Sequence, residues 1–211
     1  MNNQIDFRVL ELLSSRLCHD LVGPVGAVNN GLELMADDSF GMADDALKLA
    51  TSSASQAAAT LQFYRLAYGL AGSRMGSDYA TLNQLAVNYL SHTKVDFKWP
   101  DLTAPEGLPD NGGKVLLNLI ALGVEMLPRG GVITALSGNA DTGAFVAVTV
   151  TGESVSIREE VKEALTDDVE TEELTPRNVH AYFTRFLARQ SGTDLLINNS
   201  VEGHVQLIVS F

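Results

Sequence analysis

The sequence has little of what cross-links a chain or anchors it in a membrane. It holds one cysteine, Cys18, in 211 residues, so no disulfide can form within the chain, and a reducing cytoplasm fits this usage. No apolar run reaches 18 residues, which excludes a membrane-spanning helix of ordinary composition. Residues 1–6 lack the basic and then apolar pattern of a secretion signal. We therefore expect a cytoplasmic protein that does not contact membranes.

Basic residues are also scarce. Lys and Arg number 14 against 26 Asp and Glu, which gives a formal net charge of −12. Because nucleic-acid binding usually needs a basic patch, this balance argues against DNA or RNA as a partner. Apolar residues make up 45% of the chain, enough for a buried core, and the length suits one large or two small domains.

The apolar residues of the first 35 positions follow the period of a helix with one buried stripe, in steps of three and four: Leu10, Leu13, Leu17, Leu21, Val25, Val28, Leu32 and Met35. This spacing predicts a helix from Asp6 or Phe7 to Met35. A second helix is expected from a cap at Asp44 or Asp45 to between residues 68 and 71. Together they predict an antiparallel hairpin.

A hairpin of two helices has too little interior to hide two apolar stripes. Pairing with a second copy of the chain would form a four-helix bundle, so we predict a homodimer. The alternative is that the hairpin packs only on the rest of its own chain.

His19 projects from the first helix on the side opposite the apolar stripe. A lone outward histidine is usually a solvated surface residue. Here Pro24 lies inside the same helical pattern, where it removes a backbone hydrogen bond. Each glycine in a helix costs roughly 1 kcal/mol relative to alanine, so glycines beside His19 indicate a place where another molecule comes close. The same outward face carries Leu12, Gly23, Gly26 and Asn30.

The stretch from His19 to Pro24 reads His-Asp-Leu-Val-Gly-Pro and resembles the phosphoacceptor box of two-component histidine kinases, commonly His-Glu-Leu-Arg-Thr-Pro. With residues 12–16 and 26–33, it is similar more specifically to the ChpT-type histidine phosphotransferases of alphaproteobacteria. This resemblance implies that His19 takes up a phosphoryl group. Asp20 would then accept a hydrogen bond from the other ring nitrogen, or face solvent in the unphosphorylated protein.

The resemblance also implies a surface around His19 that meets a partner receiver domain. Arg16 would contact the phosphoryl oxygens or the receiver, or else form a surface salt bridge. The full set of expected receiver or phosphoryl contacts is Leu12, Ser15, Arg16, Gly23, Gly26 and Asn30.

The rest of the chain mixes helices with mostly antiparallel strands, which predicts an α+β domain in two layers. We expect a first domain over residues 1–73 and a second over 77–211, joined by a hinge-like segment. The expected elements are helices over 82–90 (capped by Thr81), 114–127, 157–165 and from Pro176 to Arg189, and strands over 95–99, 131–136, 144–151, 195–198 and 204–210.

This second part is similar to the ATP-binding domain of histidine kinases, over residues 115–131 and 179–211, but the nucleotide-binding residues differ. Leu122 stands where the family has the asparagine that holds Mg²⁺, and leucine cannot ligate a hard cation. Gly152 replaces the aspartate that binds adenine, and Ser154 and Ser156 replace glycines. We therefore expect a degenerate ATP-binding domain with no kinase activity and no cofactor of its own, the Mg²⁺ coming with the partner receiver.

The predicted function is that of a histidine phosphotransferase in a multistep phosphorelay, with the phosphoryl group on His19. The resemblance implies a CckA-type hybrid kinase receiver as donor and CtrA- and CpdR-type response regulators as acceptors, in cell-cycle control. The main alternative is a non-catalytic dimeric pseudokinase scaffold that docks response regulators. An active kinase and a nucleic-acid-binding module are further alternatives, disfavoured by Leu122 and Gly152 and by the net charge.

Overall fold

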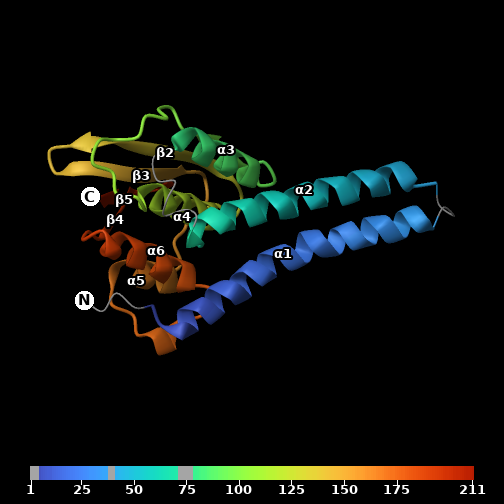
Figure 1. Ribbon diagram of the computed structural model, residues 1–211, viewed down its shortest axis with the longest axis horizontal. Coiled ribbons are helices and arrows are strands. Elements are labelled where there is room, and N and C mark those ends of the chain that lie inside the picture. The colour runs from blue at the N-terminus through green and yellow to red at the C-terminus, as the bar shows by residue number, and fades with distance from the viewer. Residues whose placement is uncertain (1–4, 38–40, 71–77) are drawn as a thin grey trace.

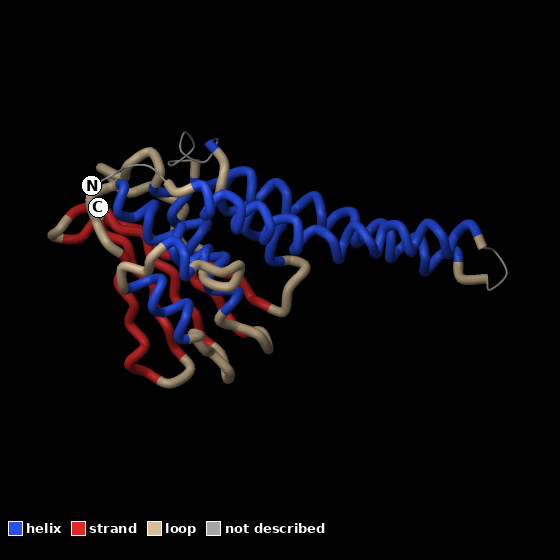
Figure 2. The backbone as a smooth tube through the Cα atoms, turned by 90° about the horizontal axis from the view of Figure 1, so that it is seen from below, coloured by secondary structure: helices blue, strands red, loops and turns tan. Residues whose placement is uncertain are grey.

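The computed structural model describes residues 5–37, 41–70 and 78–211 (Figure 1). Two long helices, α1 (Phe7–Ala36) and α2 (Ala43–Ala67), form an antiparallel hairpin that projects from the rest of the molecule (Figures 1 and 2). The carboxylate of Asp6 caps α1 by accepting a hydrogen bond of 2.7 Å from the backbone N–H of Arg8. The predicted hairpin is thus present, and α1 begins and ends within one residue of its expected bounds.

The remaining elements, within residues 78–211, form what we call the C-terminal layer. In it, helices pack on a five-stranded sheet ordered β1-β2-β3-β5-β4. The β1 and β2 strands pair in parallel, and every other pair in the sheet is antiparallel. The α+β class is therefore confirmed. The elements are α3 (Tyr79–Leu90), β1 (Val95–Lys98), α4 (Gly112–Glu125), β2 (Gly131–Ala140), β3 (Gly143–Thr151), α5 (Glu159–Thr166), the 3₁₀ turn η3 (Thr171–Glu173), α6 (Val179–Gln190), β4 (Leu195–Val201) and β5 (His204–Ser210).

Several element ends differ from the predictions. Helix α2 begins at Ala43, so Asp44 and Asp45 lie in its first turn, where the helix dipole favours acids, instead of capping it. Helix α3 begins at Tyr79, since Asp78 accepts a hydrogen bond of 3.1 Å from the N–H of Thr81.

The last helix, α6, starts later than Pro176. A turn precedes it, in which the side chain of Asn178 accepts a hydrogen bond of 2.8 Å from the N–H of Thr175. The β2 and β3 strands run further than expected and leave a tighter turn between them. Gly143 resumes the chain there at φ 123°, a conformation that disfavours side chains.

The core of the molecule centres on α4, in which every residue from Gly112 to Gly123 is buried. Gly123 allows α4 to lie close to the sheet, because a Cβ at this position would come within 3.0 Å of Ile133 and 3.1 Å of Val150. The base of the hairpin belongs to the same core through Leu13 of α1 and Phe63 of α2. The C-terminal layer and the base of the hairpin therefore share one core and pack against each other.

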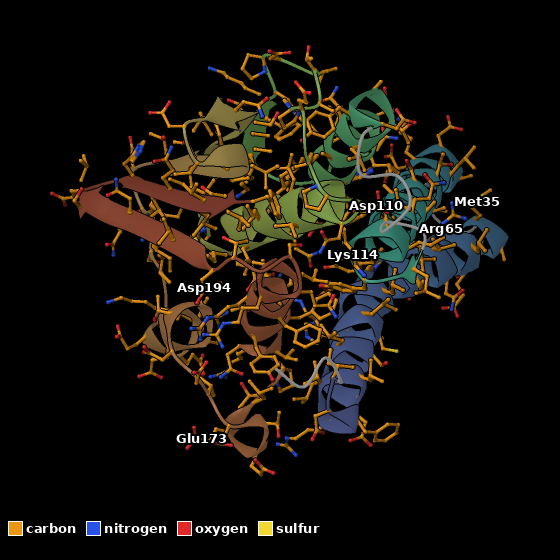
Figure 3. All side chains as sticks on the ribbon, turned by 60° about the vertical axis from the view of Figure 1, so that its left-hand side comes forward. Met35, Arg65, Asp110, Lys114, Glu173 and Asp194 are labelled. Atoms are coloured by element: carbon orange, nitrogen blue, oxygen red, sulfur yellow. The ribbon has the colours of Figure 1, made fainter. Side chains whose placement is uncertain are left out.

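Hydrogen bonds fix both ends of the hairpin base. At the end of α2, the Lys114 ammonium donates to the carbonyl of Tyr68 at 3.2 Å, and Figure 3 shows Lys114 beside this end of the helix. At the start of α1, the Arg8 guanidinium donates to the carbonyl of Leu174 at 3.1 Å. The phosphoacceptor candidate His19 thus lies on a helix whose N-terminal part is anchored to the C-terminal layer.

Farther out, the two helices touch each other closely at one glycine. A Cβ at Gly31 would lie 2.9 Å from both the carbonyl oxygen of Ala46 and the Cβ of Ala50. The small side chains of Ala46 and Ala50 let the two backbones approach at this point.

The predicted apolar stripe of α1 is for the most part not buried within one chain, since Leu10, Val25 and Leu32 are 46–53% exposed. The predicted boundary between the two domains falls at residues outside the described ranges. Among the helices in the described ranges, none combines the length and hydropathy that crossing a membrane would need.

Candidate functional site

The side chain of His19 stands out from the middle of α1 and is 89% exposed. This confirms its predicted outward direction. Its Nδ1 lies 3.3 Å from Oδ1 of the neighbouring Asp20. An acceptor at Nδ1 favours the tautomer that carries its proton there, which leaves Nε2 with a free lone pair. In this tautomer of the neutral ring, the exposed Nε2 offers its lone pair to an incoming electrophile.

Asp20 is held on both carboxylate oxygens. While Oδ1 faces His19, Oδ2 accepts a hydrogen bond of 2.6 Å from the Tyr64 hydroxyl on α2. Burial raises the pKa of Tyr64 far above its usual value, and the nearby Tyr89, Tyr68 and Asp20 raise it further, so this hydroxyl remains a donor. Of the two arrangements expected for Asp20, the structure shows the one that holds the histidine ring.

Arg16 does not point toward His19. Its guanidinium lies 2.6 Å from Oε1 of Glu125 at the end of α4, and both side chains are less than a fifth exposed. Burial is the largest influence on Arg16 and opposes its charge, but the charge of Glu125 together with those of the nearby tyrosines and Asp20 outweighs it, so the pKa of Arg16 stays above its usual value. Of the alternatives for this residue, the salt bridge is the one present, and it ties α1 to the C-terminal layer instead of lying on the surface.

Glu125 also binds His180 of α6, with 2.8 Å between Oε1 and Nδ1. Burial opposes the charge on Glu125, but the hydrogen bonds and charges of His180 and Arg16 outweigh it and hold the pKa of Glu125 below its usual value. Burial lowers the pKa of His180, and Glu125 offsets part of that effect. His180 is completely buried, so it cannot serve as a second phosphoacceptor.

The same network reaches the end of α2. His180 Nε2 lies 3.2 Å from the side-chain oxygen of Asn118, whose amide group donates to the carbonyls of Ala67 and Lys114 at 2.8 Å each. Polar contacts of buried and half-buried groups therefore join α1, α2, α4 and α6 next to the His19 turn. Sequence reasoning missed Tyr64, Glu125 and His180 in this network, because each meets its partner across more than 40 positions of the chain.

The glycines beside His19 open the surface of α1. A Cβ at Gly23 or at Gly26 would meet nothing within 4 Å. Pro24 has no N–H, and the helical bond it lacks is the one to the carbonyl of Asp20, four positions earlier. Ser15 and Asn30 are exposed, as expected for receiver contacts. Leu12 is half-buried and packs against the core, so it offers only part of its side chain.

Comparisons with known proteins show the family to which the chain belongs. A family model described as the histidine phosphotransferase C-terminal domain matches residues 79–203. Protein phosphotransferase ChpT of Brucella abortus (strain 2308) is 36% identical over 192 residues, which cover 90% of each chain. The chain belongs to the histidine phosphotransferase family. The 1.7 Å structure of a bacterial phosphotransferase superposes on it with a TM-score of 0.82 and 31% identity, over 97% of each chain. The predicted family is therefore confirmed, and the protein is a phosphotransferase of two-component signalling.

In the pairing that the family resemblance implies, Leu122 and Gly152 of the phosphotransferase stand where a kinase would hold its nucleotide. Leu122 is completely buried and lines a groove of about 340 Å³ together with Glu125 and Arg158. A Cβ at Gly152 would lie 2.9 Å from the side chain of Leu127 and 3.2 Å from the carbonyl of Gly130, so an aspartate does not fit there without a shift. Neither the magnesium ligand nor the adenine-binding carboxylate of a kinase has a counterpart at these positions.

Within the described ranges, no group of three or more His, Cys, Asp or Glu side chains of the phosphotransferase is arranged to hold a metal ion. That it works without a resident cofactor stays a prediction, since the absence of a cluster does not test it. Its one cysteine, Cys18, is exposed beside His19.

Proposed function

We propose that His19 is the phosphoacceptor of a multistep phosphorelay. It would carry a phosphoryl group between the receiver domain of a hybrid histidine kinase and the receivers of response regulators. The observation that carries this proposal is the pairing of an 89% exposed ring with a carboxylate at its Nδ1. A nucleophile must be open to its partner and have one nitrogen free, and His19 meets both conditions.

In the proposed transfer, the lone pair of Nε2 attacks the phosphorus of a receiver's aspartyl phosphate in line with the bond that breaks. The P–N bond forms as the P–O bond breaks, and the receiver keeps its carboxylate. The ring becomes positively charged with its proton still on Nδ1, where Asp20 accepts the hydrogen bond. We propose that the Mg²⁺ this reaction uses comes with the receiver. Transfer to the next receiver is the reverse of this step.

The receiver would approach over the open face of α1. Gly23 and Gly26 leave room for its backbone, and Ser15 and Asn30 offer polar contacts. A phosphoryl contact by Arg16 would require that its guanidinium leave Glu125. On the family resemblance, we propose a CckA-type receiver as donor and CtrA- and CpdR-type regulators as acceptors, in a cytoplasmic pathway of cell-cycle control.

The proposed homodimer rests on the exposed apolar surface of the hairpin. Leu10, Val25 and Leu32 of α1 and Leu47 and Leu61 of α2 are each about half exposed in the single chain. An apolar groove between the helices, lined by Leu17, Leu61, Tyr64 and Tyr68 among others, continues this surface. A second hairpin laid against it would bury these residues in a four-helix bundle, which is how such helices usually reach a stable core.

A transfer assay tests the phosphorelay. The phosphotransferase, His19→Ala and the control His92→Ala, which changes an exposed histidine at the end of α3, are each mixed with a radiolabelled phospho-receiver from the hybrid kinase of the same genome. Acid-labile label should appear on the wild type and on His92→Ala but not on His19→Ala. A parallel reaction with ATP and Mg²⁺ and no donor should leave the protein unlabelled.

Two results would contradict the proposal. Label from ATP alone would identify an active kinase, and the expectation that the second domain has no kinase activity would be wrong. No label from any receiver tested, with receiver binding intact, would favour the non-catalytic scaffold that docks response regulators.

A further inference from the structure

The Tyr64 hydroxyl reaches the His19 turn from the other helix of the hairpin. It lies 2.6 Å from Oδ2 of Asp20, whose Oδ1 is 3.3 Å from Nδ1 of His19. The three side chains therefore form a line of hydrogen bonds from the interior of the molecule to the exposed ring. Tyr64 is buried, the Asp20 side chain is 30% exposed and the His19 side chain is 89% exposed, so exposure increases along this line toward the solvent.

We propose that Tyr64 is a positioning residue for the phosphotransfer on His19. Its hydroxyl fixes one oxygen of Asp20, so that the other oxygen accepts the Nδ1–H of His19 and Nε2 keeps its lone pair toward the receiver. This inference rests on the proposed function of His19 and adds a residue that the phosphoacceptor box does not contain.

The surroundings of Tyr64 give its hydroxyl a fixed position. Its ring stacks on Tyr68 at a centroid distance of 4.8 Å and meets the edge of Phe63 at 6.0 Å. A side chain packed in this way cannot change rotamer without moving its neighbours. Asp20, by contrast, is partly open to water, where a carboxylate with a single exposed partner would rotate freely. The fixed donor is therefore what confines Asp20.

Confining Asp20 acts on both halves of the relay. Before transfer, the acceptor at Nδ1 selects the tautomer with a nucleophilic Nε2. After transfer, the same acceptor keeps the proton on Nδ1 of the phosphorylated ring. The ring can then leave as neutral imidazole when the next receiver's carboxylate attacks the phosphorus. The P–N bond breaks, a P–O bond forms, and the proton stays on Nδ1 throughout.

The test compares two identical substitutions one helical turn apart. Tyr64→Phe removes the hydroxyl on Asp20 and keeps the ring. Tyr68→Phe removes a buried hydroxyl that has no hydrogen-bond partner among the described residues, and it keeps the stacked ring as well. Single-turnover transfer from a phospho-receiver should slow by about tenfold in Tyr64→Phe, because a hydrogen bond to a charged group is lost. It should be unchanged in Tyr68→Phe, and receiver affinity should be unchanged in both.

A spectroscopic measurement separates positioning from a structural role and does not depend on transfer. Long-range ¹H–¹⁵N NMR of the ring should show His19 mainly as the Nδ1–H tautomer in the wild type and in Tyr68→Phe. In Tyr64→Phe the spectrum should move toward a mixture of tautomers. In an Asp20→Asn background, the further change Tyr64→Phe should have no effect, because the two residues act through the same contact.

Three outcomes would overturn the proposal: wild-type transfer and tautomer in Tyr64→Phe, equal slowing in both tyrosine variants, or slowing of Tyr64→Phe with an unchanged His19 tautomer. A failure of the phosphorelay itself would look different. In that case His19 would carry no phosphoryl group in the wild type, while the NMR comparison would still report whether Tyr64 orders the ring.

Discussion

The longest helix and the most buried helix of this phosphotransferase use their residues in opposite ways. In α4, every residue from Gly112 to Gly123 is buried within the single chain. In α1, only Val9, Leu13 and Gly31 of 30 residues are buried. The surface of α4 is thus covered by its own chain, whereas α1 leaves both an apolar stripe and His19 exposed. The difference supports the proposal that the hairpin meets partners, whereas the C-terminal part of the chain buries its own apolar surface.

The largest expected effect is on the free energy of unfolding, and it distinguishes a substitution in the buried core from one on the exposed stripe of α1. Leu119→Ala, in the buried helix, should lower the free energy of unfolding by about 4 kcal/mol, since it leaves a cavity. Leu32→Ala, on the exposed stripe, should instead weaken self-association by about tenfold, or 1.4 kcal/mol. Denaturant unfolding of Leu119→Ala and sedimentation of Leu32→Ala at several concentrations measure the two. A wild type that sediments as a monomer at every concentration would refute the predicted dimer.

The next effect concerns the ion pair that joins the two regions. Glu125→Gln should cost about 3 kcal/mol of stability, because it leaves the largely buried Arg16 without its partner charge. The control Glu160→Gln removes a partly exposed carboxylate 4.0 Å from Arg158 and should change stability by about 0.5 kcal/mol or less. Thermal or denaturant unfolding compares the two, and equal losses would contradict this account of Glu125.

The same pair predicts a pH dependence. The pKa of Glu125 is lower in the folded than in the unfolded protein, so the unfolded chain binds the proton first as the pH falls. Its contribution to stability is therefore complete above about pH 4.3 and is lost below that value. The stability difference between wild type and Glu125→Gln should shrink in that acid range. A difference that stays constant down to pH 3 would show that the charge of Glu125 does not contribute.

A smaller effect tests how closely the two helices of the hairpin touch. Gly31→Ala puts a Cβ 2.9 Å from the backbone of Ala46 and from Ala50, so the helices must separate. We expect a loss of about 2 kcal/mol by overpacking. Calorimetric unfolding measures it. No change in melting temperature would mean that the hairpin adjusts without cost at this point.

The smallest effect has the opposite sign for stability. Gly26→Ala meets nothing within 4 Å and should stabilise α1 by up to about 1 kcal/mol through helix propensity. The same methyl group stands on the surface proposed for the receiver, so transfer to or from the receiver should become slower. A variant that is more stable and transfers at the wild-type rate would remove Gly26 from the proposed docking surface.

The sequence predicts those features that repeat along it. The apolar period of α1 gives its bounds within a residue and the outward direction of His19, because a single long helix obeys one spacing throughout. The strands of the C-terminal layer also follow from alternation, although β2 runs four residues further than expected. The local motif from His19 to Pro24, taken with its flanks and the resemblance of the second part of the chain, predicts the family, which the comparisons confirm.

Contacts between residues far apart in the sequence cannot be predicted from such a repeating pattern. Tyr64 meets Asp20 over 44 positions and Arg16 meets Glu125 over 109, and neither pair has a local signature. The glycine that permits close helix contact is Gly31, whereas the pattern drew attention to Gly23 and Gly26. Only the packed structure shows which glycine faces a neighbouring helix and which faces open space.

The base of the hairpin and the C-terminal layer share one core. We therefore expect the protection of backbone amides from hydrogen exchange to vary along α1. Amides around Leu13 should exchange with solvent deuterium only when the whole molecule unfolds, whereas those beyond Gly23 should exchange through local openings. His19 lies where these two regimes meet. The part of α1 before its helical turn packs on the core. The part after it lacks the backbone hydrogen bond to the carbonyl of Asp20, because Pro24 has no N–H. We therefore expect the outer half of the hairpin to yield to a bound receiver more readily than the inner half.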